Sequence, residues 1–289
     1  MDLGTVGIWW SGTWSTEGGG PASGAAVMEG LGYGALWSSG GFEAGFPARF
    51  SRLLGATDHL AVASGIISIW HATSAQVAEG ADALETAHPG RFLLGLGVSH
   101  APIVTQLGTD YTRPYARMVR YLDQLDEHGR AVASDRRVLA ALGPRMLTLA
   151  AERAAGAHPY FVPVEHLARA RALVGPEPLL APELAVVLEA DPATARATAR
   201  GYTAGYLGLP NYVGNLRTLG FDDDDLEGGG SDRLVDAVVA WGDSAAIAER
   251  VRQFHDAGAD HVCIQVVADR AAGFPLRAYR EVRSALPGR

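Results

Sequence analysis

The chain has 289 residues, of which 48% are hydrophobic and 19% charged, so it can bury a large core and no window has the composition of a disordered tract. Its net charge of −8 argues against a nucleic-acid partner and against an anionic membrane surface. No apolar run reaches the roughly 18 residues of a membrane span, and the start of the chain lacks the features of a signal peptide, so we expect a cytoplasmic protein.

Eight short apolar runs recur along the chain, and turn residues and segments of helical periodicity lie between them. The predicted strands are 5–10, 34–39, 60–70, 92–98, 137–143, 156–162, 179–189 and 261–267. The predicted helices are 74–90, 112–129, 143–156, 163–175, 191–208 and 242–259. Continuous apolar strands that alternate with amphipathic helices are typical of a parallel sheet. Eight such units predict a (β/α)₈ TIM barrel, with residues 1–289 as one domain.

Two segments interrupt this alternation, 9–24 after the first strand and an insertion at 208–232. Both are too long and irregular for tight connections, and such segments are usually lids or binding loops. The acidic run 222–225 lacks the spacing of a calcium loop, so we interpret it as a solvated turn and predict no metal site. The single cysteine, Cys263, lies in an apolar run, where a buried thiol without a catalytic role is expected.

The common catalytic motifs are absent or incomplete. The sequence has no lysine, which excludes Schiff-base chemistry and a P-loop. Residues 95–100 have only two of the glycines of a dinucleotide-binding motif, with His100 in the place of the third. The motifs H-E-x-x-H, C-x-x-C and G-x-S-x-G do not occur.

A strand-to-helix turn at 143–146 is a candidate phosphate site. Gly143 ends a predicted strand and Pro144 suits the first position of a helix. The backbone N–H groups of Arg145 and Met146 would then be free at a helix N-terminus, where a phosphate is favoured. An ordinary turn explains the same residues equally well.

Five segments, in order along nearly the whole chain, resemble the luciferase-like monooxygenase superfamily. They are GYGALWSS, ASGIISIWH, HPGRFLLGLGVSH, LAALGPRMLTLAAERAAGAHPYFVPVEH and VAWGDSAAIAERVRQFHDAGADHVCIQVV. Within that superfamily they are most similar to oxidoreductases that use the deazaflavin coenzyme F420. The resemblance implies a bacterial-luciferase-like barrel, a homodimer, and hydride transfer between F420 and an organic substrate.

The resemblance also implies where the coenzyme binds. In these barrels a non-prolyl cis peptide in the third strand forms a bulge that supports the deazaflavin ring, and Gly65-Ile66 matches that position. Glycine inside an apolar strand also fits a plain kink. The residues implied to bind the coenzyme are Ser38, Ser39, Gly65, Ile66, Leu96, Gly97, Val98, Ser99, Gly143, Pro144, Arg145 and Met146.

The chain departs from the family at the end of the second strand. Many relatives carry there an acidic residue and a histidine proposed to assist proton transfer, where this chain has Gly40 and Gly41. The candidates to replace them are His71, His158 and Tyr160, since a histidine of near-neutral pKa could move the proton. Each could equally be a packing or hydrogen-bonding residue.

Tryptophans near the first two strand ends predict an aromatic pocket. Trp10, Trp14 and Trp37 are assigned to it, although Trp9 or Trp10 must face the core because neighbouring strand residues point in opposite directions. We expect a small, mostly apolar carbonyl, alcohol or alkene as substrate. An FMN-dependent monooxygenase and a barrel that binds a flavin or deazaflavin without turnover are the alternatives.

Overall fold

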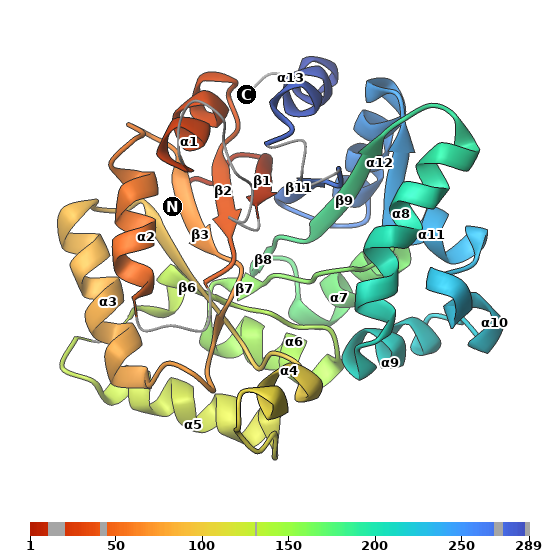
Figure 1. Ribbon diagram of the computed structural model, residues 1–289. Helices are drawn as coiled ribbons and strands as arrows, with labels where there is room; N and C mark the ends of the chain where they lie inside the picture. Colours follow the sequence, from red (N-terminus) through yellow and green to blue (C-terminus); the bar gives the residue numbers. More distant parts are fainter. Residues whose placement is uncertain (11–20, 41–44, 131, 269–273, 287–289) are drawn as a thin grey trace.

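The computed structural model describes residues 1–10, 21–40, 45–130, 132–268 and 274–286. Parallel strands occupy the centre and helices surround them (Figure 1). The strands are β1 (Val6–Trp10), β2 (Ala35–Ser38), β3 (Ala61–Ser64), β4 (Ile67–Ser68), β5 (Phe92–Gly97), β6 (Arg137–Leu139), β7 (Gly156–Ala157), β8 (Leu179–Leu180), β9 (Glu183–Leu188), β10 (Val239–Gly242) and β11 (Val262–Val266).

The helices that cover the sheet include the six predicted ones. They are α1 (Pro21–Gly30), α2 (Phe46–Leu54), α3 (Ser74–Ala87), α4 (Ala101–Gln106), α5 (Pro114–Glu127), α6 (Pro144–Arg153), α7 (Val164–Val174), α8 (Pro192–Leu207), α9 (Pro210–Thr218), α10 (Asp223–Leu226), α11 (Asp232–Val238), α12 (Ser244–Asp256) and α13 (Leu276–Ala285). Among the helices of the described ranges, none is both long and apolar enough to cross a membrane.

The sheet closes on itself and confirms the predicted TIM barrel. Its strand order is β10-β9-β11-β1-β2-β3-β5-β6-β7-β8, and only Ala181 and Pro182 separate β8 from β9 in the chain. The N–H of Ala181 donates to the carbonyl of Ala157, and the N–H of Cys263 donates to the carbonyl of Pro182. The segment 179–188 is therefore one barrel strand that joins β7 on one side to β11 on the other.

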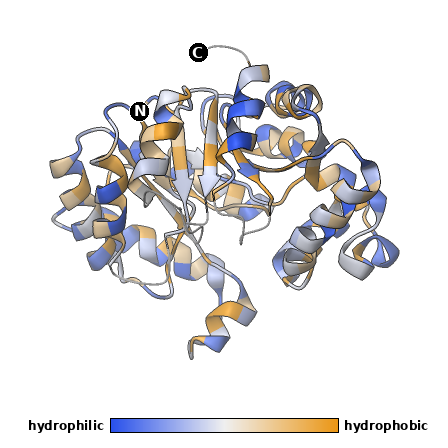
Figure 2. Ribbon diagram, turned by 45° about the horizontal axis from the view of Figure 1, so that its top comes forward, coloured by the Kyte–Doolittle hydropathy of each residue, from blue (hydrophilic) through white to orange (hydrophobic). Residues whose placement is uncertain are grey.

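All eight predicted strands are present, with β3 and β4 in the third and β8 and β9 in the seventh. The strands are almost wholly apolar and buried, whereas the helices carry polar residues among apolar ones (Figure 2). Capping explains several helix starts: Thr73 and Gln76 form a capping box on α3, and Asp191 and Asp243 cap α8 and α12.

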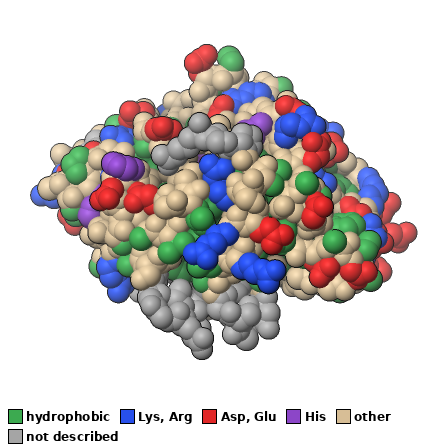
Figure 3. Space-filling view, turned by 90° about the horizontal axis from the view of Figure 1, so that it is seen from above, with side chains coloured by type: hydrophobic (Ala, Val, Ile, Leu, Met, Phe, Trp, Pro, Cys, Tyr) green, Lys and Arg blue, Asp and Glu red, His purple; other side chains and the backbone are tan. Residues whose placement is uncertain are grey.

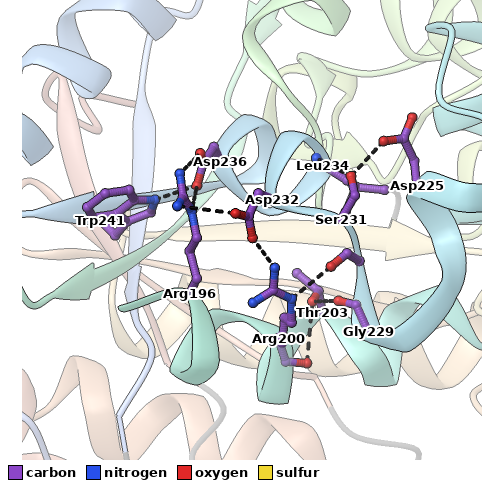
Figure 4. A network of polar contacts seen from close by, with 11 residues as sticks. Arg196, Arg200, Thr203, Asp225, Gly229, Ser231, Asp232, Leu234, Asp236 and Trp241 are labelled. Carbon is purple, nitrogen blue, oxygen red and sulfur yellow. Dashed lines mark hydrogen bonds and ion pairs between the residues drawn. The ribbon is translucent and has the colours of Figure 1, made fainter. Parts of the chain in front are cut away.

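The insertion at 208–232 is largely helical, so the prediction of an irregular loop there was wrong. It contains α9 and α10 and leads into α11. Arginines on α8 hold it in place, as Figure 4 shows. Arg196 binds both carboxylate oxygens of Asp236, at 2.9 and 2.6 Å, and also pairs with Asp232 at 3.2 Å. Arg200 pairs with Asp232 as well.

The acidic run 222–225 begins a helix rather than a turn, and its first three residues are exposed to solvent as predicted. Asp222 and Asp225 form the capping box of α10. Asp225 is buried and accepts hydrogen bonds from Ser231 and Arg233, which hold the pKa of this carboxyl below its usual range. The other irregular segment, 9–24, ends β1 and begins α1, and its residues 11–20 lie outside the described part of the chain.

Charge of both signs is mixed on the described part of the face seen in Figure 3, where acidic and basic side chains are interspersed. Cys263 is fully buried, as expected, and burial raises the pKa of its thiol.

Gly95→Ala should destabilise the protein by about 3 kcal/mol, as overpacking of a close-packed interior does. A Cβ at Gly95 would lie 1.8 Å from the carbonyl oxygen of Ser64, so two strands would have to separate. Gly201→Ala is the matched control, because nothing lies near that exposed position on α8, and it should gain about 0.5–1 kcal/mol. Urea unfolding measures both changes, and equal stability of Gly95→Ala and the wild type would contradict this packing.

Candidate functional site

The third barrel strand is interrupted between β3 and β4, where the Gly65-Ile66 peptide bond is cis, as predicted. The neighbouring strand β2 contacts the bulge on one side. The N–H of Gly65 donates to the carbonyl of Ser38 at 2.8 Å, and the N–H of Gly40 donates to the carbonyl of Ile66 at 3.2 Å. A Cβ at Gly40 would lie 2.5 Å from the Ile67 side chain and 2.8 Å from the Ile66 carbonyl oxygen, so glycine is required there.

Strand β5 contacts the bulge on the other side through small residues. Ser64 and Gly95 exchange two hydrogen bonds, since the Gly95 N–H donates to Ser64 Oγ at 2.7 Å and the hydroxyl donates back to the Gly95 carbonyl at 3.0 Å. A Cβ at Gly97 would lie 2.6 Å from Ile66 Cδ1. The glycines of β5 therefore make room for the bulge and for the Ile66 side chain.

A cavity of about 420 Å³ lies in front of the bulge, at the carboxyl ends of the barrel strands where TIM-barrel active sites occur. Its volume is within the range of small-molecule sites. Its wall is mostly apolar and aromatic. It includes Trp9, Ser39, Gly65, Ile66, Val98, Ser99, His100, Ala140, Met146, His158, Tyr160, Tyr206, Asn211 and Tyr212.

A second hollow of about 360 Å³ continues from the cavity, because Val98, Gly143, Met146 and Asn211 line both. Tyr111, Pro114, Tyr115, Pro144 and Arg145 complete its wall. The Arg145 guanidinium lies 4.0 Å from the centre of the Tyr115 ring, a cation–π contact that positions the charge. The site thus has an apolar compartment next to the bulge and an outer compartment that carries a cation.

The turn at 143–146 begins α6 as predicted, with Gly143 as N-cap and Pro144 in the first turn. The N–H of Met146 donates to the carbonyl of Gly143 at 3.1 Å, so the prediction that this N–H is free was wrong. For the N–H of Arg145, no backbone acceptor is found within the described ranges. One backbone donor and the Arg145 side chain therefore remain for an anion.

His158 lies at the base of the cavity and is only 2% exposed. Its Nδ1–H donates to the carbonyl of Ala181 at 2.6 Å, and its ring stacks on Trp37 at 4.3 Å. Burial lowers the pKa of His158 to about 4, so the expectation of a near-neutral value was wrong. No hydrogen-bond partner for Nε2 is found in the described part of the chain, and at neutral pH this nitrogen is an acceptor.

Tyr160 also lines the cavity, where its ring packs edge-on against Trp9 at 5.3 Å. Its hydroxyl donates to Gln265 Oε1 at 2.6 Å and lies 2.7 Å from the hydroxyl of Tyr206. Burial raises the pKa of Tyr160 well above its usual value. This phenol is therefore protonated at neutral pH and can donate a hydrogen bond.

His71 does not line this cavity but a separate one of about 340 Å³, together with Arg117 and Arg120. Ser68, which lines the main cavity, has its Oγ 3.1 Å from His71 Nδ1. Burial lowers the pKa of His71. We therefore assign no proton-transfer role to it.

The prediction of which tryptophans line the cavity and which lie in the core was wrong for Trp10 and Trp37. Trp9 forms part of the cavity wall, whereas Trp10 packs in the core, with its ring 5.5 Å from that of Phe274. Trp37 is fully buried, and its Nε1–H donates to His261 Nε2 at 3.1 Å. Trp14 lies outside the described residues.

Some of the predicted coenzyme-binding residues at the ends of β2 and β5 line the cavity, and others are buried behind its wall. Ser39, Val98 and Ser99 line the cavity. Ser38 is buried behind it and accepts a hydrogen bond from Arg49 at 2.7 Å, and Leu96 and Gly97 are buried in β5. These three residues shape the wall from behind rather than forming its surface.

Several wall residues were not predicted, because they come from the N-cap of α4 and from α8 and α9. They are His100, Tyr206, Asn211 and Tyr212. Burial lowers the pKa of His100 to about 4. The sequence does indicate one of these residues: Tyr202 and Tyr206 are four residues apart in a predicted helix and so share a face.

Within the described ranges, no group of three His, Cys, Asp or Glu side chains could hold a metal ion.

A model of the luciferase-like monooxygenase family matches residues 23–261. No curated protein matches the sequence. Among solved structures, the F420-dependent tetrahydromethanopterin reductase from Methanopyrus kandleri has a TM-score of 0.74 at 15% identity, over 98% of both chains. An F420-dependent secondary alcohol dehydrogenase in complex with an F420–acetone adduct has a TM-score of 0.68 at 14% identity, over 98% of this chain and 99% of that one.

An FMN complex has the same fold. The oxygenating constituent of 3,6-diketocamphane monooxygenase from Pseudomonas putida has a TM-score of 0.66 at 16% identity, over 99% of this chain and 100% of that one. At these identities the likeness concerns the fold, and the structures compared include both F420-dependent and FMN-dependent proteins.

Proposed function

The chain belongs to the luciferase-like monooxygenase family, and from that premise we propose that it is an F420-dependent oxidoreductase. It transfers a hydride between the deazaflavin and a small, mostly apolar organic substrate. The observation that carries this proposal is the cavity in front of Gly65 and Ile66, together with its continuation into the hollow beside Arg145.

The residues present fit such a coenzyme. Gly65 has no side chain, so the backbone of the bulge itself forms part of the cavity wall. Ile66, Val98 and Ala140 offer an apolar surface to a planar ring. The N-terminus of α6 and the Arg145 guanidinium, in the adjoining hollow, suit a phosphate-bearing tail.

When bound, the deazaflavin supplies or accepts the hydride. The apolar cavity walls would exclude water and hold the substrate next to the bound coenzyme. Tyr160 holds a proton that can be donated to the substrate, because burial keeps its pKa high. The Nε2 of His158, for which the described residues supply no partner, can accept a hydrogen bond from a hydroxyl or amide of a bound ligand.

Turnover tests the proposal directly. Purified protein is incubated with reduced F420 and a panel of small ketones, aldehydes and alkenes, and the return of the oxidised deazaflavin is followed by absorbance. We expect oxidation that depends on both enzyme and substrate. The FMN-dependent alternative instead predicts tight FMN binding and substrate oxidation that requires oxygen, and binding of F420 without turnover of any panel member would favour a barrel that only binds its ligand.

Arg145→Gln should weaken F420 binding roughly tenfold, the worth of one charge-assisted hydrogen bond. The effect should shrink at high salt, because the side chain is exposed and its charge is screened. Arg120→Gln is the matched control, since Arg120 lines the other cavity beside His71. Fluorescence titration measures both, and equal affinity of Arg145→Gln and the wild type would remove Arg145 from the coenzyme site.

The proposed homodimer remains a prediction, which light scattering of the purified protein would test.

A further inference from the structure

A buried carboxyl group lies behind the cavity. Glu183, the first residue of β9, pairs in register with Cys263 of β11 and is 1% exposed. Its Oε2 accepts the N–H of Phe161 at 3.3 Å and its Oε1 accepts the hydroxyl of Tyr202 at 3.1 Å. Within the described ranges, no ion pair involves it.

The titratable groups that interact with Glu183 in the described part of the chain are neutral at pH 7. They are Tyr160 after β7, Tyr202 on α8, Tyr212 on α9, Cys263 on β11 and Tyr279 on α13. With no cation to compensate it, burial raises the pKa of Glu183 to about 8. The carboxyl therefore holds its proton at neutral pH.

Hydroxyl groups connect this carboxyl to the cavity. The Tyr202 hydroxyl, bonded to Glu183, lies 3.3 Å from the hydroxyl of Tyr160, which lies 2.7 Å from that of Tyr206. Tyr160 and Tyr206 line the cavity, whereas Glu183 and Tyr202 do not. A chain of hydrogen-bonded oxygen atoms thus leads from the protonated carboxyl of Glu183 to the cavity wall. Such a path could replace the acid and base that this chain lacks at Gly40 and Gly41.

We propose that Glu183 stores the proton that accompanies hydride transfer and that Tyr202, Tyr160 and Tyr206 pass it to a carbonyl oxygen of the substrate. The inference rests on the proposed function and narrows the substrate to a carbonyl compound, or to the alcohol in the reverse direction. Glu183 and Tyr202 act through Tyr160 and are positioning residues.

The proton balance is simple. As hydride reaches the carbonyl carbon, the Tyr160 hydroxyl turns from Gln265 to the substrate oxygen, its O–H bond breaks and a new O–H bond forms on that oxygen. The Tyr202 hydroxyl turns from Glu183 to Tyr160 and gives it a proton, and the carboxyl of Glu183 gives its own proton to the Tyr202 oxygen and is left as a carboxylate. After the product leaves, a proton from cavity water returns along the same hydroxyls.

Two substitutions and a control distinguish proton storage by Glu183 from a purely structural role of this residue. Phe161 has a left-handed backbone, with φ of 57°, and its N–H is held by Glu183. Glu183→Gln keeps an oxygen acceptor for Phe161 but cannot store a proton. Tyr202→Phe interrupts the chain and leaves the carboxyl in place. Tyr33→Phe is the matched control, because it removes another buried tyrosine hydroxyl, which donates to the carbonyl of Tyr279.

Infrared spectroscopy of the full-length protein tests the inference without turnover. The C=O stretch of a protonated carboxyl, assigned by its loss in Glu183→Gln, should be present at pH 7. On transfer to D₂O the proton should exchange roughly tenfold or more slowly in Tyr202→Phe than in the wild type, and Tyr33→Phe should match the wild type. Absence of the band at pH 7, or equal exchange in Tyr202→Phe and the wild type, overturns the proposal.

The two proposals fail separately. A protein that shows the carboxyl band and the Tyr202-dependent exchange but binds no F420 rejects the proposed function and leaves the relay intact. A protein that oxidises reduced F420 with a ketone, at rates that Glu183→Gln and Tyr202→Phe do not lower at any pH, rejects the relay alone.

Discussion

Replacing Ala140 by tryptophan should weaken F420 binding by about a hundredfold or more, equivalent to roughly 3 kcal/mol. Ala140 forms part of the cavity wall beside Ile66, and its Cβ lies 3.2 Å from the position that a Cβ on Gly97 would take. An indole at this position would occupy much of the 420 Å³ in front of the bulge. A rigid three-ring coenzyme cannot adapt to the smaller space.

Two controls separate blocking of the site from loss of the fold. Ala83→Trp adds the same side chain to an exposed position on α3 and should bind F420 like the wild type. Ala140→Ser adds a single atom to the wall and should change affinity by no more than a few fold. If Ala140→Trp folds, by circular dichroism, and still binds F420 as tightly as the wild type, the coenzyme lies elsewhere.

The free energy of unfolding should decrease steeply as the pH is lowered from 6 to 5. Burial lowers the pKa of four histidines, His100, His158, His166 and His261, to about 4. In the unfolded chain histidine titrates near 6.5. Between these values the unfolded state binds four protons that the folded state excludes, so stability falls as the pH falls through this window.

Glu183 acts in the opposite direction. Its folded pKa of about 8 lies above its unfolded value, so between about pH 4.5 and 8 the folded state holds a proton that the unfolded chain has released. Its contribution to stability is present at low pH and is lost as the pH rises. A net difference of two to three protons remains between about pH 5 and 6, which corresponds to about 3 to 4 kcal/mol per pH unit. Stability should be greatest near about pH 7.

Urea unfolding between pH 5 and 8 measures this dependence. His166→Leu removes one of the four histidines with a lowered pKa and should lower the acid slope by about 1.4 kcal/mol per pH unit. His59→Gln changes an exposed histidine and should leave the slope as it is. A stability that is constant between pH 6 and 5 would contradict the burial of neutral histidines.

The barrel was predictable because buried parallel strands are continuous apolar runs, and each of the eight runs became a barrel strand. Strand β10 was missed because it follows α11 directly, with no glycine or proline between them. The helices of the insertion were missed although their signals are local. Pro210 opens α9, and Asp222 with Asp225 forms a capping box.

The site was harder to predict than the fold. Gly65 could be singled out because a glycine interrupts an apolar strand, and the resemblance specified its geometry. Which of Trp9 and Trp10 faces the cavity depends on the orientation of one strand, which the pattern leaves open. The low pKa of His158 depends on burial by residues distant in the chain. Glu183 gave a usable signal, because an acidic residue within the apolar run 179–189 has to be buried and satisfied.

The most direct measurement is an equilibrium titration of the purified protein with F420, followed by its fluorescence, beside a parallel titration with FMN. We expect saturable binding of F420, with one site per chain, that is lost in Ala140→Trp and kept in Ala83→Trp, and weaker binding of FMN. Tight binding of FMN with no affinity for F420, or F420 binding that Ala140→Trp does not alter, would contradict a deazaflavin site in front of Gly65 and Ile66.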